Sequence, residues 1–224
     1  SRVEKTALAE AEVEYHDRQV DAVWVKFPVV RSGASREGSD AENVSDLMAT
    51  EVVIWTTTPW TLPQNRAISF GPGISYGLYE VTGTPDDRYL LADALAGATL
   101  TAARLEDGMW TRVRDVPTDE LAALICAHPL RGAEGADGEW DYDVPLFPGD
   151  HVTDDAGTGF VHTAPSHGDD DYQIGLKHGL KMTFNIEADG SYRADLPLFG
   201  GEAILKPNGK PGGANKAVID KLVE

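Results

Sequence analysis

The sequence predicts one α+β domain built around a barrel-like or curled β-sheet, with a few peripheral helices. Three observations lead to this prediction. Short runs rich in Val, Ile, Phe, Tyr and Thr dominate the chain, and Gly or Pro separates them. Helical patterns are fewer and lie between these runs. The 224 residues are enough for a proper hydrophobic core, so we expect a single domain over 1–224.

The strand predictions rest on β-branched and aromatic residues bounded by turn formers. The runs "VDAVWVKFPVV" and "EVVIWTT" are the clearest, and the others are shorter. The predicted strands are 20–30, 51–57, 66–72, 75–81, 88–92, 160–165 and 181–186.

The helix predictions rest on capping and charge patterns. Thr118 is a candidate cap, and two acidic residues follow it. The segment 169–179 opens with aspartates and ends on Lys177, His178 and a glycine, which is a typical start and stop. The predicted helices are 93–105, 118–128, 169–179 and 214–224. Loops are predicted at 32–46, 131–139 and 206–213, and none has the composition of an interdomain linker.

The composition excludes several classes of protein. Hydrophobic residues make up 42% and charged residues 25%, which is ordinary for a globular protein, and no apolar run reaches the roughly 18–20 residues of a membrane span. The first residues, "SRVEKTALAEAEVEY", are charged, unlike a signal peptide, and begin with Ser1, so we expect a piece of a longer chain. Cys126 is the single cysteine, which excludes a disulfide framework and favours a small buried side chain. A cytoplasmic location is compatible with this single cysteine.

The net charge of −18 argues against a stand-alone nucleic-acid-binding protein, because phosphate contacts need Lys and Arg. The positive charge is uneven, however, and could form a local basic rim or only a solvated surface. The lysines that gather toward the C-terminal end are Lys177, Lys181, Lys206, Lys210, Lys216 and Lys221.

The stretch "WTTTPWTLPQN" (55–65) places three hydroxyls where a strand is predicted to end. Thr58 followed by Pro59 is typical of a helix cap and first helical residue, so a short turn should follow. Neighbouring hydroxyls there could bind a ligand or hold a water molecule. They could also satisfy backbone groups at the junction between strand and turn.

The stretch "GTGFVHTAPSHGDDDYQIG" (157–175) brings together glycines, histidines and aspartates. Gly157 and Gly159 allow a close approach of the backbone. His162 lies on a predicted strand, His167 in the turn, and three aspartates at a predicted helix N-terminus.

Four interpretations of this second stretch are open. The two histidines and an aspartate could bind a metal, but the spacing matches no metal motif. Ser166, His167 and an aspartate could form a triad, but adjacent Ser and His side chains rarely face each other. One aspartate could bind a cationic group. The acids could also only complement the helix dipole, although three are more than capping requires.

The two stretches "WTTTPWTLPQNRAIS" and "GTGFVHTAPSHGDDDYQIGLKHGL" together closely resemble the editing domain of isoleucyl-tRNA synthetase, which is inserted into the catalytic core of that class I enzyme. The segments 1–15 and 214–224 resemble the connections to the core. "VHTAPSHGDDDY" is similar to the isoleucyl type, whereas valyl and leucyl relatives carry other residues there. The loops 32–46 and 131–139 match nothing in the family.

The resemblance implies a hydrolase that removes valine from mischarged isoleucine tRNA, and valyl-adenylate is a second implied substrate. Isoleucyl-tRNA synthetase is itself the standard example of why editing is needed: valine lacks one methylene of isoleucine, and this difference lets the enzyme favour isoleucine by only about 150-fold. The implied partners are the 3′ end of tRNA(Ile) and the rest of the synthetase chain. The domain itself would use no metal or cofactor, and the parent enzyme would use ATP and Mg²⁺.

The resemblance also implies site residues. Thr56, Thr57 and Thr58 line the pocket with Trp55 and Asn65 beside them, and Thr57 is implied to place the water. Asp171 corresponds to the family's aspartate that anchors the α-amino group. His162 corresponds to the pocket histidine that excludes isoleucine. His167 is expected to support the structure of the turn. The alternatives are a valyl-type editing domain and a non-catalytic tRNA-docking insert.

Overall fold

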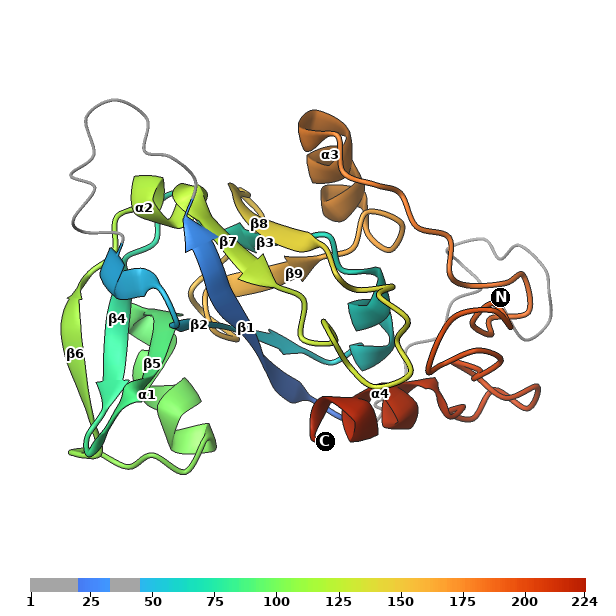
Figure 1. Cartoon of the computed structure of the whole chain (residues 1–224), viewed down its shortest axis with the longest axis horizontal. Coiled ribbons are helices and arrows are strands. Elements are labelled where there is room, and N and C mark those ends of the chain that lie inside the picture. Colours follow the sequence, from blue (N-terminus) through green and yellow to red (C-terminus); the bar gives the residue numbers. More distant parts are fainter. Residues whose placement is uncertain (1–19, 33–44) are drawn as a thin grey trace, which may run out of the picture.

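The computed structural model describes residues 20–32 and 45–224. Its strands are β1 Val23–Ser32, β2 Glu51–Thr56, β3 Ala67–Phe70, β4 Tyr76–Val81, β5 Thr84–Ala92, β6 Trp110–Asp115, β7 Leu124–Ala127, β8 Asp143–Pro148 and β9 Phe160–Thr163. Its α-helices are α1 Asp93–Ala102, α2 Thr118–Ala123, α3 Asp169–His178 and α4 Ala214–Leu222 (Figure 1). Two 3₁₀ segments, η2 Ser45–Leu47 and η3 Pro59–Gln64, flank β2.

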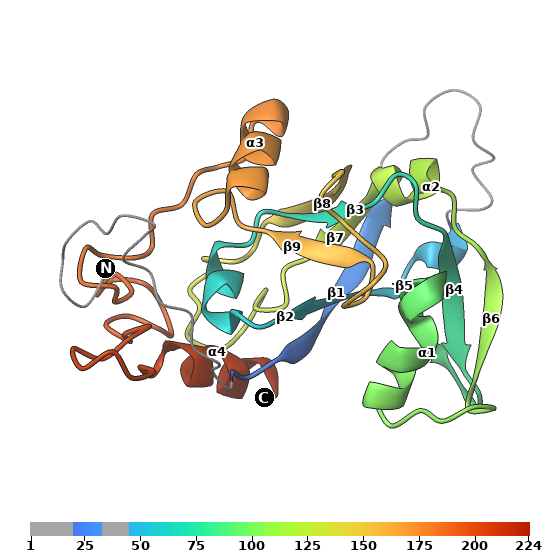
Figure 2. The same cartoon turned by 180° about the vertical axis from the view of Figure 1, so that it is seen from behind.

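The strands form one mixed sheet in the order β6-β4-β5-β2-β1-β7-β8-β3-β9. The part from β2 to β9 curls so that β9 returns beside β2, while β5, β4 and β6 extend as an arm with α1 (Figures 1 and 2). The predicted α+β class with a barrel-like core is therefore confirmed. The sheet is not closed, because β6 at one edge and β9 at the other do not pair with each other.

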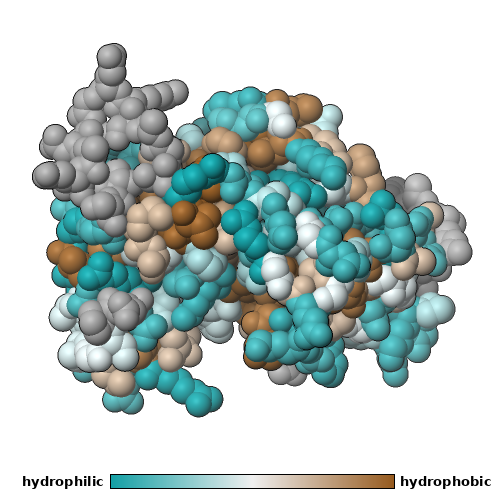
Figure 3. Space-filling view, viewed as in Figure 1, coloured by the Kyte–Doolittle hydropathy of each residue, from teal (hydrophilic) through white to brown (hydrophobic). Residues whose placement is uncertain are grey.

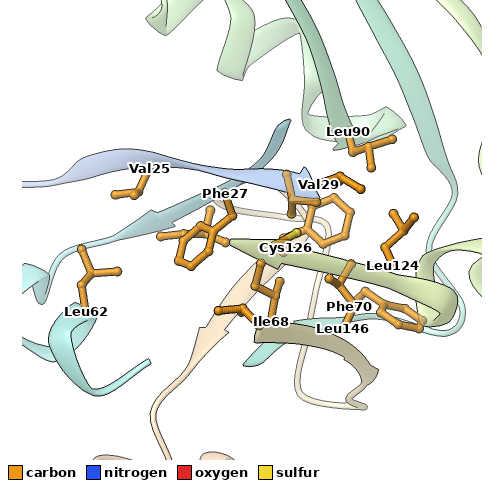
Figure 4. Packing of buried hydrophobic residues seen from close by; sticks show 14 of the residues in the cluster. Val25, Phe27, Val29, Leu62, Ile68, Phe70, Leu90, Leu124, Cys126 and Leu146 are labelled. Atoms are coloured by element: carbon orange, nitrogen blue, oxygen red, sulfur yellow. The ribbon is translucent and has the colours of Figure 1, made fainter. Parts of the chain in front are cut away.

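The main core lies inside the curled part of the sheet. Alternate side chains of the strands point inward, and Phe27, Ile68 and Leu146 are fully or almost fully buried (Figure 4). Cys126 is buried among them, as the sequence predicts, and burial raises the pKa of its thiol. A hydrophobic core of this extent holds the strand ends of β2 and β9 in fixed positions.

Two element predictions are wrong in ways that have a physical cause. The predicted helix 118–128 ends at Ala123, and Leu124–Ala127 forms β7, because this segment pairs with β1 on one side and β8 on the other. The segment 181–186 is not a strand, and only Ile186 makes an isolated bridge. It follows α3, which leaves the sheet, so no neighbouring strand is available for pairing. The strands β6 and β8 were not predicted.

Some of the remaining predictions for loops and helices are confirmed, and others fall outside the described residues. Turns occupy 131–139 without helix or strand, and α4 and α3 lie where they are predicted. The connection 1–15 and the loop residues 33–44 lie outside the described residues. None of the helices in the described ranges has the length and apolarity of a membrane crossing. Hydrophilic residues cover most of the face in Figure 3, and hydrophobic patches interrupt them.

Candidate active site

The end of β2 and the start of η3 place the threonines. Thr56 is buried as the last residue of β2, and Thr58 is the exposed residue before η3, with Pro59 as the first residue of the turn, as predicted. The Thr56 hydroxyl accepts a hydrogen bond from the Thr58 amide at 3.1 Å and lies 3.2 Å from the Thr58 hydroxyl. Part of the role of these hydroxyls is therefore local, because they satisfy the backbone where the strand ends.

Thr61 connects this stretch to His162. The Thr61 hydroxyl donates to the carbonyl oxygen of Thr58 at 2.8 Å and lies 3.0 Å from Nε2 of His162. Thr61 is 5% exposed and was missed by the sequence analysis. Its signal is the spacing, because residues three apart share one face of a 3₁₀ turn, so "TPWT" places Thr58 and Thr61 together.

The histidine on β9 is neutral at ordinary pH. Burial lowers the pKa of His162 to about 4, and the nearby His167 adds to this shift. The single proton of the Thr61 hydroxyl goes to Thr58, so Nε2 of His162 is the donor to Thr61. Nδ1 is then an acceptor, and it is buried without a partner among the described residues. The opposite tautomer would bury an unpaired N–H, which is the rarer arrangement in proteins.

Asp171 lies at the same end of β9. One carboxylate oxygen of Asp171 accepts a hydrogen bond from the amide of Ala164 at 3.1 Å, and Ala164 follows His162 by two residues. Asp169 and Asp170 are exposed, so only the third aspartate turns toward the body of the domain. Burial raises the pKa of Asp171, while the Ala164 amide and His151 act in the opposite direction.

Gly168 makes room for the Asp171 carboxylate. A Cβ atom at Gly168 would collide with the second carboxylate oxygen of Asp171. The φ of Gly168 is −175°, which any residue can adopt, so the requirement for glycine comes from the contact alone. In "HGDDD" (167–171) the glycine therefore leaves space for the Asp171 carboxylate, and the three aspartates start α3.

A cavity of about 250 Å³ opens beside the threonines. Trp55, Thr56 and Thr57 line one side of it, and the predicted close approach of the glycine backbone is confirmed there. Gly157 and Gly159 have φ of 81° and 82°, and a Cβ at Gly159 would collide with Ala92. The rest of the lining is His151, Thr153, Ala156, Phe160 and Val161.

His151 is a polar residue of the cavity that also acts on Asp171. It lines the cavity and also interacts electrostatically with the Asp171 carboxylate. Its ring lies against Gly149, where a Cβ atom would be 2.6 Å from Cε1 of His151. Nothing in "GDHVTDD" (149–155) indicates which way the His151 ring turns, so this residue could not be predicted from sequence.

Asn65 and His167 have structural contacts. Asn65 is fully buried and donates from Nδ2 to the carbonyl oxygen of Ala67 at 2.8 Å, and it lies outside the residues that line the cavity. His167 packs edge-on against Trp60, with 5.1 Å between ring centroids.

The geometry gives no support to the metal and triad interpretations. Within residues 20–32 and 45–224, no group of three His, Cys, Asp or Glu side chains is arranged to hold a metal ion. The Ser166 hydroxyl is buried without a hydrogen-bond partner among these residues, so His167 does not activate it.

Comparison with known proteins decides the family. No family model matches the chain. The isoleucine–tRNA ligase of Ruegeria pomeroyi is 50% identical over 234 aligned residues, which cover 100% of this chain and 23% of that protein. The ligase of Bradyrhizobium diazoefficiens is 47% identical, with 100% and 22% covered. The chain belongs to the isoleucyl-tRNA synthetase family.

This member of the family corresponds to its editing domain, as the resemblance implied. The chain spans about a quarter of the length of the curated relatives it matches. Among solved structures, the crystal structure of GlLeuRS-CP1 matches with a TM-score of 0.52 and 17% identity, covering 70% of this chain and 60% of that chain. The fold is thus that of the CP1 editing domains of class I synthetases.

Proposed function

We propose that this editing domain hydrolyses the ester that joins valine to tRNA(Ile), with valyl-adenylate as a second substrate. The observation that carries the proposal is that three groups lie at the ends of β2 and β9: the threonine hydroxyls, the neutral His162 and the half-buried Asp171. The partners are the 3′ end of tRNA(Ile) and the rest of the synthetase, where ATP and Mg²⁺ would serve aminoacylation.

Asp171 is the anchor for the α-amino group. The carboxylate is partly buried, the Ala164 amide holds one of its oxygens, and an ammonium group would bind to the other. A charge-assisted contact of this kind contributes roughly 1.5–3 kcal/mol. It would fix the ester carbonyl relative to the threonines.

The threonines position water instead of forming a covalent intermediate. An aminoacyl ester is already activated, so a correctly oriented water supplies most of what hydrolysis needs. Thr57 lines the cavity, and the Thr56 hydroxyl is already bonded to Thr58, so we assign the water to Thr57.

The cavity suits the nucleoside that carries the amino acid. The indole of Trp55 offers an aromatic face to a base, and His151 and Thr153 offer polar groups to a sugar. The electrostatic interaction between His151 and Asp171 supports a nucleoside position on the side of the amino acid that it carries.

The direct test is a deacylation assay of this chain with valyl-tRNA(Ile), isoleucyl-tRNA(Ile) and threonyl-tRNA(Val). Hydrolysis of the first and not the others supports the proposal. Cleavage of threonyl-tRNA(Val) would instead favour a valyl-type domain. Tight, salt-sensitive tRNA binding without cleavage would favour a docking insert, which the net charge of −18 opposes.

Gly168→Ala is expected to lower valyl-tRNA deacylation by about tenfold or more. The added methyl group would push the Asp171 carboxylate from its position while leaving the extended backbone of residue 168 unstrained. Steady-state deacylation and thermal unfolding would be measured together. The control is Gly73→Ala, because the space around the new Cβ is open and activity should not change. Gly179→Ala would not serve, because the positive φ of Gly179 strains any residue with a side chain. Full activity of Gly168→Ala would contradict the anchor geometry.

Thr61→Val is expected to weaken selection against isoleucine. Valine keeps the shape of threonine but removes the oxygen that accepts from Nε2 of His162, so the ring loses its fixed orientation. We expect the ratio of valyl to isoleucyl hydrolysis to fall about three- to tenfold. Thr61→Ser keeps the hydroxyl and should retain the ratio, and equal ratios in both variants would show that this bond does not orient His162.

A further inference from the structure

The backbone of η3, which carries Thr61 and follows Thr58, is bonded to side chains from distant parts of the chain. Trp60 donates its amide to Oδ1 of Asn215 at 3.1 Å and accepts at its carbonyl from the hydroxyl of Tyr192 at 2.6 Å. The carbonyl oxygen of Leu62 lies 3.0 Å from Nε2 of His128.

The same arrangement continues to the end of the turn. Trp140 donates from Nε1 to the carbonyl oxygen of Pro63 at 3.0 Å. Tyr142 donates from its hydroxyl to the carbonyl oxygen of Asn65 at 2.7 Å. Five side chains thus hold the backbone of four residues within 60–65. We call them the clamp residues: His128, Trp140, Tyr142, Tyr192 and Asn215.

The sequence of η3 explains why external partners are required. Pro63 has no N–H, so it cannot donate to the carbonyl of Trp60 as a 3₁₀ turn would require. Pro63 and most of its neighbours in the turn are buried, and a buried carbonyl without a partner is costly. Tyr192 supplies a donor to this carbonyl from outside the turn, and the side-chain amide of Gln64, with its oxygen and nitrogen exchanged, donates to it at 3.1 Å from within.

The clamp residues are themselves fixed in orientation. Nδ1 of His128 accepts from the amide of Leu130 at 3.1 Å, so Nε2 must carry the proton that goes to Leu62. The His128 ring stacks on Trp140, with 6.2 Å between centroids, and lies 5.5 Å from Tyr142. Burial lowers the pKa of His128 to about 3, so it stays neutral and keeps a single donor direction.

We propose that the clamp residues are positioning residues for editing, which hold the turn that sets Thr58, Thr61 and His162. They act through the backbone of η3 and do not touch the substrate. The segments on either side of the loop 131–139 thereby gain a role through His128, Trp140 and Tyr142. Tyr192 gains one as well, as does the helix α4 through Asn215. The kinetic part of this inference rests on the proposed function.

The test compares Tyr192→Phe and Asn215→Ala with the control Tyr79→Phe. Tyr192→Phe keeps the ring and removes only the donor to Trp60. Tyr79 is a matched control because its hydroxyl donates to Asp93 at 2.6 Å in the arm of the sheet, away from η3. We measure kcat and KM for valyl-tRNA(Ile), thermal unfolding, and amide hydrogen exchange of residues 58–65 by mass spectrometry.

Each clamp variant is expected to lower kcat about tenfold with KM within about twofold, because the water and ester lose their alignment after binding. Exchange over residues 58–65 should become faster than in the Tyr79→Phe protein. A lower melting temperature with native kcat and native exchange would overturn the proposal, because the clamp residues would then contribute to stability through packing alone. If the unaltered chain lacks deacylase activity, the proposed function fails, and the exchange data alone decide whether the clamp holds the turn.

Discussion

Asp171→Ala is expected to lower valyl-tRNA(Ile) deacylation by about 100-fold or more while the domain remains folded. The lost contact with the substrate ammonium, worth roughly 1.5–3 kcal/mol, corresponds to about a 10- to 150-fold loss. The ester carbonyl also loses its alignment with the water, and small misplacements of reacting atoms cost as much again. A single-turnover deacylation assay measures this effect directly.

The stability of this variant should be close to that of the unaltered protein. Because burial raises the pKa of Asp171, the folded state favours the protonated carboxyl, and stability falls as the pH rises through that pKa. At neutral pH the ionised carboxylate is therefore a destabilising group, kept for binding. We expect Asp171→Asn to melt no lower than the unaltered protein, although it should be as inactive as Asp171→Ala.

The neighbouring acids are the matched controls. Asp169 and Asp170 lie in the same helical turn and carry the same charge, but both are exposed. Asp169→Ala and Asp170→Ala should keep activity within about threefold. Equal losses in all three variants would mean that the helix start acts through its total charge, and an active Asp171→Ala would remove the anchor.

The local parts of the fold and of the site could be predicted from sequence because short-range rules determine them. The helix α3 begins with acids and ends at a glycine with φ of 65°, and Thr58 with Pro59 starts a turn. The requirement for glycine at Gly159 also follows from its own backbone.

The parts that could not be predicted depend on partners far along the chain. Leu124–Ala127 is a strand only because β1 and β8 lie on either side of it. The role of Thr61 depends on His162, which lies 101 residues later, and Tyr192 bonds to Trp60 across 132 residues. No pattern within a single segment encodes such pairs, so the sequence indicates the chemistry of the site but not the framework that holds it.

His162→Ala is expected to let the domain attack correctly charged isoleucyl-tRNA(Ile). Removing the imidazole leaves room beside Thr61, and the extra methylene of isoleucine then no longer meets a side chain. A pocket distinguishes substrates that differ by one methylene by about 10- to 200-fold, so we expect the preference for valine to shrink by about 10- to 100-fold. Parallel assays with both charged tRNAs measure the ratio.

His162→Phe separates bulk from polarity. Burial keeps the imidazole neutral, with its pKa lowered to about 4, so at neutral pH the native ring contributes shape and one free acceptor rather than charge. Phenylalanine keeps the shape but offers neither the Nδ1 acceptor nor the Nε2 donor to Thr61. If His162 acts by bulk alone, His162→Phe should reject isoleucine and still hydrolyse valyl-tRNA at close to the native rate. A slow His162→Phe that still rejects isoleucine would instead assign a ring nitrogen a part in the reaction, and Thr61→Val, which removes the partner of Nε2, tells whether that nitrogen is Nε2 or Nδ1. Isoleucine cleavage by His162→Phe would remove the steric role.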